Sequence, residues 1–307
     1  MKTLYNAAKE RKIDIRTRSK AVDILTGKDG AVAGVKVESK DGKTYTIDAK
    51  TVVLAAGGFG ANQELLVKYQ PKLKGYATTN HPGATGDGIL LAEKIGAALV
   101  DMEQIQAHPT AAPSGELISE SVRGDGAILV NAEGKRFTNE LGSTATIGAD
   151  IKAQPDGVAF LVFDRTSVEN AALMKKYEEL GYFVKADTLD ALAGKLGVDQ
   201  ANLKATVARW QGFFDKKKDD DFGRTQSMFS RIDRAPYYGQ KISPASQTSY
   251  GAVERNADGA ALKPDGTVIP GLFVAGETAD QYGQGVSLGI ITGRIAARGA
   301  LKAIEAK

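Results

Sequence analysis

The segment Val52-Val53-Leu54-Ala55-Ala56-Gly57-Gly58 carries the strongest signal for the fold. It is a continuous apolar run that ends in small residues, which is typical of a buried parallel strand. A second segment of this kind, Leu272-Phe273-Val274-Ala275-Gly276-Glu277, lies near the other end of the chain. In open α/β sheets ligands bind beyond the carboxyl ends of the strands, where glycine lets the backbone approach them closely. Either segment alone is as consistent with tight packing, but together they predict an α/β fold with a ligand-binding edge.

The residues ahead of the first segment predict a helix followed by strands. Residues 4–11 have an apolar side and predict a short amphipathic helix, and residues 13–16 alternate as a strand does. Three further alternating segments, separated by Asp-Gly turns, follow at residues 21–25, 33–37 and 45–47. We expect these three to form a β-meander.

The middle of the chain differs in character from both ends. Residues 188–208 show helical periodicity, and the polar stretch 212–235 follows them. We therefore expect residues 104–249 to form an inserted α+β domain. Residues 1–103 and 250–307 would then be the two parts of one α/β domain, which closes with a helix from about Leu288 to Ile304.

Composition excludes several classes of protein. Of 307 residues 42% are apolar and 25% charged, and the formal net charge is only +3, so the sequence predicts a globular protein without a nucleic-acid-binding surface. The chain has no cysteine, which excludes disulfides, thiolate zinc sites and iron–sulfur clusters held by this chain. We expect no metal site, and no run reaches the roughly 18 apolar residues of a membrane helix.

Five further motifs follow the first segment in a fixed order. They are Thr79-Asn80-His81-Pro82-Gly83-Ala84-Thr85-Gly86-Asp87-Gly88, Gln106-Ala107-His108-Pro109-Thr110, Ser119-Glu120-Ser121-Val122-Arg123-Gly124-Asp125-Gly126, Gly134-Lys135-Arg136-Phe137-Thr138-Asn139-Glu140 and Ala275-Gly276-Glu277. With them the chain resembles the FAD-dependent fumarate reductase and succinate dehydrogenase flavoprotein family, and most of all its soluble, flavocytochrome c members. The resemblance implies an FAD-binding, Rossmann-like domain interrupted by a capping domain, which the middle section would supply.

The resemblance also implies which residues bind FAD. The loop that wraps the flavin corresponds to the motif ending in Thr-Gly-Asp-Gly, the acidic residue after Ala-Gly binds the ribityl hydroxyls, and the start of the last helix faces the ring. A helix amino terminus stabilises negative charge on the reduced ring. Turn formation and helix capping are the alternative roles for Asp87 and Glu277. The cofactor-binding candidates are Gly57, Gly58, Asn80, His81, Thr85, Gly86, Asp87, Gly88, Glu277, Leu288, Gly289, Ile290 and Ile291.

One expected element has no counterpart in the sequence. Members of this family begin with a strand, a G-x-G-x-x-G turn and a helix that hold the pyrophosphate. No such spacing occurs here, since Gly283-Gln284-Gly285 is followed by Leu288 where the last glycine should stand. We therefore expect the amino-terminal part of the FAD domain to be missing from this chain. Any signal peptide would belong to that part, so the compartment stays open.

Four residues match catalytic positions of the fumarate-reducing members. There the flavin gives a hydride to an activated double bond, an arginine supplies the proton through a Glu–Arg relay, and other residues clamp two carboxylates. The resemblance assigns the clamp to His108 and to Ser119, which replaces a threonine and keeps its hydroxyl, and the relay to Glu120 and Arg123. A structural role is the alternative for His108.

Three other catalytic positions depart from the family pattern. Thr144 aligns with the proton-donating arginine, and Ser287 and Thr248 align with a clamp arginine and a clamp histidine. The hydroxyl groups of serine and threonine are poor proton donors near neutral pH and cannot neutralise two buried carboxylates. We therefore expect a substrate other than fumarate. Tyr250 and Tyr282 lie near the altered positions and could donate the proton, although both could equally be packing tyrosines.

The sequence thus favours a flavin-dependent oxidoreductase. It would move a hydride between FAD and a carbon–carbon double bond conjugated to a carbonyl or carboxylate, and take electrons from an external haem, FMN or iron–sulfur protein or domain. The alternative is a non-catalytic fragment or degenerate family member that binds FAD weakly or not at all. A nicotinamide dehydrogenase is disfavoured, because no complete dinucleotide fingerprint is present.

Overall fold

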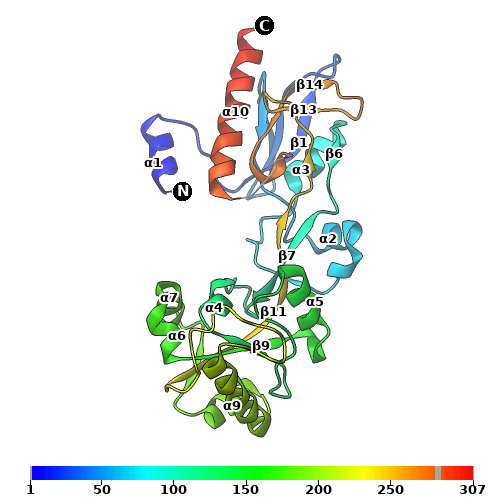
Figure 1. Cartoon of the computed structure of the whole chain (residues 1–307). Helices are drawn as coiled ribbons and strands as arrows, with labels where there is room; N and C mark the ends of the chain where they lie inside the picture. Colours follow the sequence, from blue (N-terminus) through cyan, green and yellow to red (C-terminus); the bar gives the residue numbers. More distant parts are fainter. Residues whose placement is uncertain (1, 281–284, 307) are drawn as a thin grey trace. The chain divides into compact units, whose positions relative to one another are not determined.

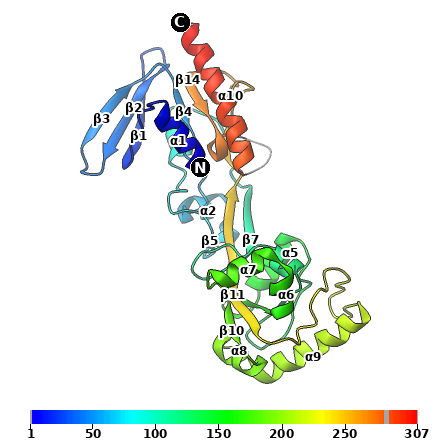
Figure 2. The same ribbon diagram turned by 90° about the vertical axis from the view of Figure 1, so that its left-hand side faces the viewer.

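The protein, seen here as a computed structural model that describes residues 2–280 and 285–306, forms two compact units (Figures 1 and 2). The first unit comprises Met1–Gly58, Gly86–Met102 and Tyr250–Lys307, and the second comprises Phe59–Thr85 and Glu103–Ser249. None of the helices in the described ranges is long and apolar enough to span a bilayer. The mixed α/β fold expected from the sequence is confirmed.

The first unit begins with the expected helix and β-meander. Helix α1 covers Lys2–Glu10, and strands β1 (Ser19–Thr26), β2 (Val32–Ser39) and β3 (Thr44–Asp48) pair antiparallel in that order. The prediction of a strand at residues 13–16 is wrong, because these residues have no regular secondary structure. Ile13 and Ile15 are exposed, so their alternating pattern has no core to face.

A second sheet of the first unit joins the two ends of the chain. Strand β4 (Val52–Leu54) runs parallel to β14 (Val268–Val274), which also pairs antiparallel with β13 (Ala260–Leu262). Helix α10 (Val286–Glu305) packs along this sheet and buries Ala296 and Ala300 against Phe273 (Figure 1). Helix α3 (Asp87–Lys94) and the short strands β6 (Leu99–Val100) and β12 (Ala252–Val253), which pair with each other, complete the unit, with η3 (Gly276–Thr278) after β14.

The parallel strand is less buried than the sequence predicts. Leu54 is buried, but Val53 is 40% exposed. Within the described ranges β4 pairs with β14 only, so one edge of the strand carries no neighbour.

The second unit is built on one long strand. Strand β11 (Tyr237–Ser249) pairs with β10 (Val184–Ala186) and β9 (Ala159–Asp164) through its first half and with β7 (Ile105–Ala111) and β5 (Ala77–Thr78) through its second half, while β8 (Ile128–Val130) pairs with β9. The short helices are α2 (Gln63–Tyr69), η1 (Pro71–Leu73), α4 (Ser121–Gly124), α5 (Thr144–Lys152), η2 (Pro155–Gly157), α6 (Arg165–Asn170) and α7 (Ala172–Glu179).

The helical pattern at residues 188–208 belongs to two helices. Helix α8 (Leu189–Leu196) ends at Gly197, whose φ of 73° is left-handed, and α9 (Gln200–Lys216) begins after its N-cap Asp199. A left-handed residue ends a helix, and glycine adopts that conformation without strain.

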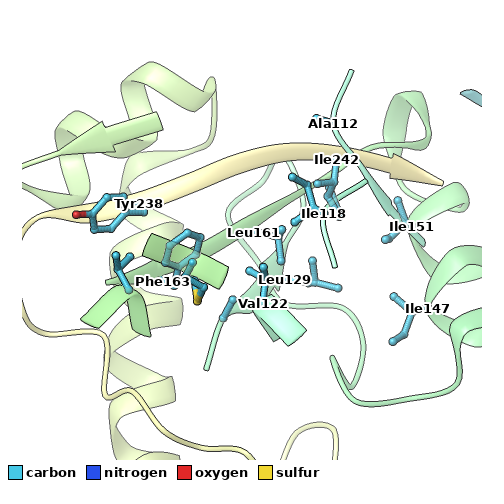
Figure 3. Packing of buried hydrophobic residues seen from close by; sticks show 14 residues of the cluster. Ala112, Ile118, Val122, Leu129, Ile147, Ile151, Leu161, Phe163, Tyr238 and Ile242 are labelled. Carbon is cyan, nitrogen blue, oxygen red and sulfur yellow. The ribbon is translucent and has the colours of Figure 1, made fainter. Parts of the chain in front are cut away.

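Both faces of the second unit's sheet are covered by helices. On one face Leu129, Leu161 and Ile242 of the sheet pack with Ile147 and Ile151 of α5 (Figure 3). The other face buries Trp210 and its neighbours from α9. The second unit therefore has a hydrophobic core of its own, which can hold side chains on its loops and strand ends in fixed positions.

Candidate active site

In the first unit, the ends of two parallel strands form a glycine-lined edge. Leu272–Val274 stand in register with Val52–Leu54, and the N–H of Ala275 continues the ladder to the carbonyl oxygen of Leu54 at 2.9 Å. Just beyond, Gly57 and Gly276 have φ values of 82° and 65°. A Cβ atom on either would meet no atom within 4 Å, so this edge is open.

Helix α3 begins against the same edge. Its N-cap, Gly86, has a φ of 80° and donates its N–H to the carbonyl oxygen of Gly58 at 3.1 Å. Gly88 lies so close that a Cβ there would stand 2.9 Å from the Cβ of Ala56. The Asp87 carboxylate pairs with the Lys20 ammonium at 3.0 Å. Asp87 thus has a structural partner at the helix start.

Helix α10 presents an open amino terminus. Its N-cap Gly285 has no side chain to accept from the first turn, so within the described residues the first N–H groups have no side-chain cap. Leu288 and Gly289 are half-buried, whereas Ile290 and Ile291 are each 53% exposed. Thr292 accepts from the N–H of Gly276 at 2.9 Å and so fixes η3 to this helix. Glu277 is half-buried in η3.

Three of the cofactor-binding candidates lie in the second unit. Asn80 donates to the hydroxyl of Thr78 at 3.1 Å and to the carbonyl oxygen of Ser246 at 3.2 Å. The ring of His81 accepts from the N–H of Gly83 at 3.0 Å. The hydroxyl of Thr85 donates to the carbonyl oxygen of Gly83 at 3.4 Å. Each side chain therefore has a local role in this turn.

In the second unit the catalytic candidates of β7 and α4 come together. His108 is buried in β7, and its Nε2 lies 3.3 Å from Oε2 of Glu120, the residue that precedes α4. The Ser119 hydroxyl donates to the same carboxylate oxygen at 3.4 Å. Nδ1 of His108 faces both the N–H of Thr110 at 3.3 Å and its carbonyl oxygen at 3.2 Å. The Glu120 carboxylate can only accept, so we assign a ring proton to Nε2.

The environment keeps His108 neutral and Glu120 charged near pH 7. Burial lowers the pKa of His108 from its ordinary value, and the hydrogen bond to Glu120 opposes this only in part. The pKa of Glu120 is lowered by the hydrogen bond from its own backbone N–H and then by the bond from His108. A neutral imidazole thus donates to a carboxylate whose side chain is 72% exposed.

Arg123 lies one turn after Glu120 and is buried. Its Nη1 donates to the carbonyl oxygen of Glu140 at 2.6 Å, and its Nε has no acceptor among the described residues. Burial lowers the pKa of Arg123, while the charges of Glu120 and Glu140 oppose the shift. A buried cation next to an accessible carboxylate can stabilise negative charge or pass on a proton.

Behind Arg123 lies a charge network that sequence reasoning missed. The Glu140 carboxylate accepts both Nε and Nη2 of Arg136 at 2.8 Å and Nη1 of Arg224 at 3.2 Å. Arg224 also donates to the carbonyl oxygens of Arg123 and Ala127, each at 2.9 Å. Glu140 and Arg136 belong to a motif noted in the sequence, but Arg224 lies in a polar stretch that carries no signal of burial.

The remaining candidates are dispersed or lie outside the described residues. Tyr250 is half-buried in the first unit, and Tyr282 lies outside the described residues. Thr144 is the first residue of α5, Thr248 pairs with Gln106 across β11 and β7, and Ser287 is exposed in the first turn of α10.

Comparison with known proteins identifies the family. Residues 1–289 match the sequence model of the protein family described as "FAD binding domain". The chain therefore belongs to this family of flavoproteins, and its cofactor is FAD. The resemblance to fumarate reductase flavoproteins is thereby confirmed.

Individual relatives agree with this assignment. The chain is 38% identical to a fumarate reductase (cytochrome) of Shewanella frigidimarina over 98% of this chain and 54% of that protein. It is 36% identical to a urocanate reductase of Eggerthella lenta over 85% of this chain and 45% of the relative. The structure of an open conformation of a flavocytochrome c3 fumarate reductase matches with a TM-score of 0.91 and 36% identity, covering 98% of this chain and 55% of that one. The chain thus spans about half the length of these relatives.

Proposed function

We propose that this chain is the substrate-handling part of an FAD-dependent oxidoreductase that acts on a carbon–carbon double bond conjugated to a carbonyl or carboxylate. The observation that carries the proposal is the contact of buried His108 with Glu120, one turn from buried Arg123. The names of the relatives, a fumarate reductase and a urocanate reductase, support the same reaction type.

The open edge of the first unit fits FAD. Gly57 and Gly276 leave room where side chains would stand, and the uncapped start of α10 offers N–H groups beside exposed Ile290 and Ile291. We assign cofactor binding to these residues together with Gly58, Gly86, Gly88 and Glu277. FAD, when bound, supplies or accepts the hydride.

The residues of the second unit would handle the substrate and the proton. The imidazole of His108 and the hydroxyl of Ser119 would orient the activating carbonyl or carboxylate with the hydrogen bonds that they otherwise give to Glu120. Glu120, anionic near pH 7, and the Arg123 guanidinium would move the proton to the reacting carbon, with Tyr250 or Tyr282 as its final donor.

We propose a substrate other than fumarate. The positions that align with a proton-donating arginine and two dicarboxylate-binding residues hold Thr144, Ser287 and Thr248. A second carboxylate in such a pocket would lose its water without gaining a cation. A monocarboxylate or an enone avoids that cost.

The proposed function is tested first by absorbance and then by turnover. Purified chain is titrated with FAD and followed in the visible region, and the loaded chain is then assayed with a reduced dye against enoates and enones. Glu120→Gln should lower the rate by roughly 10²- to 10⁴-fold. Glu116→Gln, on the same loop but outside the cluster, is the control. Equal rates for the two variants would exclude Glu120 from the reaction.

A further inference from the structure

A cavity of about 290 Å³ lies within the second unit, and nothing above assigns it a role. Its walls come from the segment around η1, from the start of β7 and from the start of α5, and include Leu73, Tyr76, Ala107, Thr144, Ala145 and Gly148. Ligand pockets measure about 300–1,000 Å³, so this one suits a single ring or a short branched chain.

The cavity exists because α5 carries small residues on one side. Thr144, Ala145, Gly148 and Ala149 line it, whereas Ile147 and Ile151 point from the same helix into the core (Figure 3). Gly148 is buried, yet a Cβ built on it would meet no atom within 4 Å. The cavity is open to solvent on one side, since Ala145 and Ala149 are exposed, and the missing side chain at Gly148 deepens it.

The walls fit an uncharged group. Lys72 is the one charged side chain among the described residues that line the cavity, and it is exposed. Tyr76 is half-buried, and the buried Oε1 of Gln70 has no donor partner in the described structure. Its cations are peripheral, since Lys72 is exposed and the Lys152 ammonium lies 5.3 Å from the centre of the Tyr76 ring. An apolar ring would gain contacts with Leu73, Tyr76 and the small residues of α5.

The cavity adjoins the catalytic candidates along the chain. The start of β7 lines the cavity with three consecutive residues, Ile105, Gln106 and Ala107. Because they are consecutive, the cavity is not confined to one face of the strand. His108 is the next residue of β7. Thr144 comes four residues after Glu140, whose carbonyl oxygen accepts from Arg123 at 2.6 Å. Successive residues of a strand lie about 3.3 Å apart, so the wall formed by Ala107 adjoins the backbone of His108.

We propose that this cavity holds the uncharged apolar group attached to the substrate's double bond, while His108, Ser119 and Glu120 take the activating carbonyl or carboxylate. This inference rests on the proposed function. It makes the substrate class an aryl- or branched-alkyl-substituted enoate or enone.

The test compares acrylate with 3-phenylacrylate as substrates of the FAD-loaded chain. Gly148→Leu fills the cavity and should lower kcat/KM for 3-phenylacrylate at least tenfold, with less than a twofold change for acrylate. Gly148→Ala should show a smaller loss while its melting temperature rises, because alanine favours the helix. Gly212→Leu, at a helical glycine of α9 with no atom within 4 Å of its added Cβ, is the matched control and should change neither value.

A binding measurement without any reductant separates this proposal from the proposed function. By calorimetry, 3-phenylpropanoate should bind at least tenfold more tightly than propanoate, and Gly148→Leu should abolish the difference. If that result is obtained but no enoate is reduced, the cavity assignment stands and the proposed function fails. If acrylate is reduced, but the phenyl group raises neither affinity nor kcat/KM and Gly148→Leu changes neither value, the cavity assignment is overturned and the proposed function stands. Absence of both binding and turnover overturns both.

Discussion

Arg224 shows how single residues set the geometry of the candidate site. Its side chain is fully buried, and it donates to the backbone of Arg123 and Ala127 and to the carboxylate of Glu140. Burying a guanidinium is costly unless every donor is used, and breaking such a pair leaves the partner's charge uncompensated. Arg224 therefore positions Arg123 and does not itself take part in the chemistry.

We expect Arg224→Met to destabilise the second unit by about 3–5 kcal/mol, because Glu140 loses a cation and four carbonyl groups lose a donor. Urea unfolding followed by the fluorescence of Trp210 measures this. Arg231→Met is the control, because Arg231 pairs with Asp215 and Asp233 in an exposed position and should matter little. Equal losses in the two variants would refute a special role for Arg224.

His108 should make the stability depend on pH. Burial lowers its pKa below the ordinary value of 6.5, so the unfolded chain takes up a proton before the folded chain does. The free energy of unfolding should therefore fall as the pH is lowered through 6.5 toward the folded pKa. In His108→Gln that part of the fall should be absent, which urea unfolding between about pH 7.5 and 5.5 would show.

The chain has only two histidines, His81 and His108, so proton NMR resolves their titrations without crowding. The Hε1 signal that disappears in His108→Gln should titrate below 6.5 in the folded protein. A midpoint above that value would mean that the Glu120 carboxylate outweighs burial.

Among the elements, α3 depends on a close approach to the strand ends. A methyl group on Gly88 would collide with the Cβ of Ala56 at 2.9 Å and crowd Thr278 at 3.3 Å. Gly88→Ala should push the helix from the open edge and lower the free energy of unfolding by about 1–3 kcal/mol. It should also weaken FAD binding, measured by absorbance titration. The control is Gly293→Ala in α10, where an added Cβ meets nothing within 4 Å. This change should leave the free energy of unfolding equal or higher. A similar loss in both variants would show that the contact of Gly88 with Ala56 is not the cause.

The sequence predicted elements wherever a local pattern coincided with burial. The β-meander and the two parallel strands appear as expected, because alternation and apolar runs report directly on which faces are covered. At residues 13–16 the same alternation predicted a strand that does not form, since a strand also needs a partner strand, which no local pattern specifies. The helical periodicity expected at residues 188–208 is confirmed, and it is divided between α8 and α9 at Gly197.

For the site, the motifs brought out His108, Ser119 and Glu120, which the structure places in contact. They could not bring out Arg224, because its burial arises from a loop that folds back on α4 from about a hundred residues away. The cavity beside α5 was equally hidden, because small residues in a helix predict close packing as readily as open space.

At the scale of the whole chain, the two units offer separate signals. The one tryptophan of the sequence, Trp210, is buried in the core of the second unit. The residues proposed for FAD binding, namely Gly57, Gly58, Gly86, Gly88, Gly276, Glu277 and the start of α10, belong to the first unit. Tryptophan fluorescence therefore reports on one unit, and far-ultraviolet circular dichroism on both.

FAD should stabilise the two units unequally. Asn80, His81 and Thr85 of the second unit already use their side chains in local hydrogen bonds, so we expect the first unit to supply most of the binding energy. At about 100 times its Kd, a ligand adds about 2.7 kcal/mol to the unit that binds it, which raises a melting temperature by several degrees. The part of the circular dichroism change that does not coincide with the Trp210 transition belongs to the first unit and should shift by that amount, while the Trp210 transition moves by much less. Equal shifts would show that FAD ties the units into one cooperative body, and would assign Asn80, His81 and Thr85 a direct share in holding the cofactor.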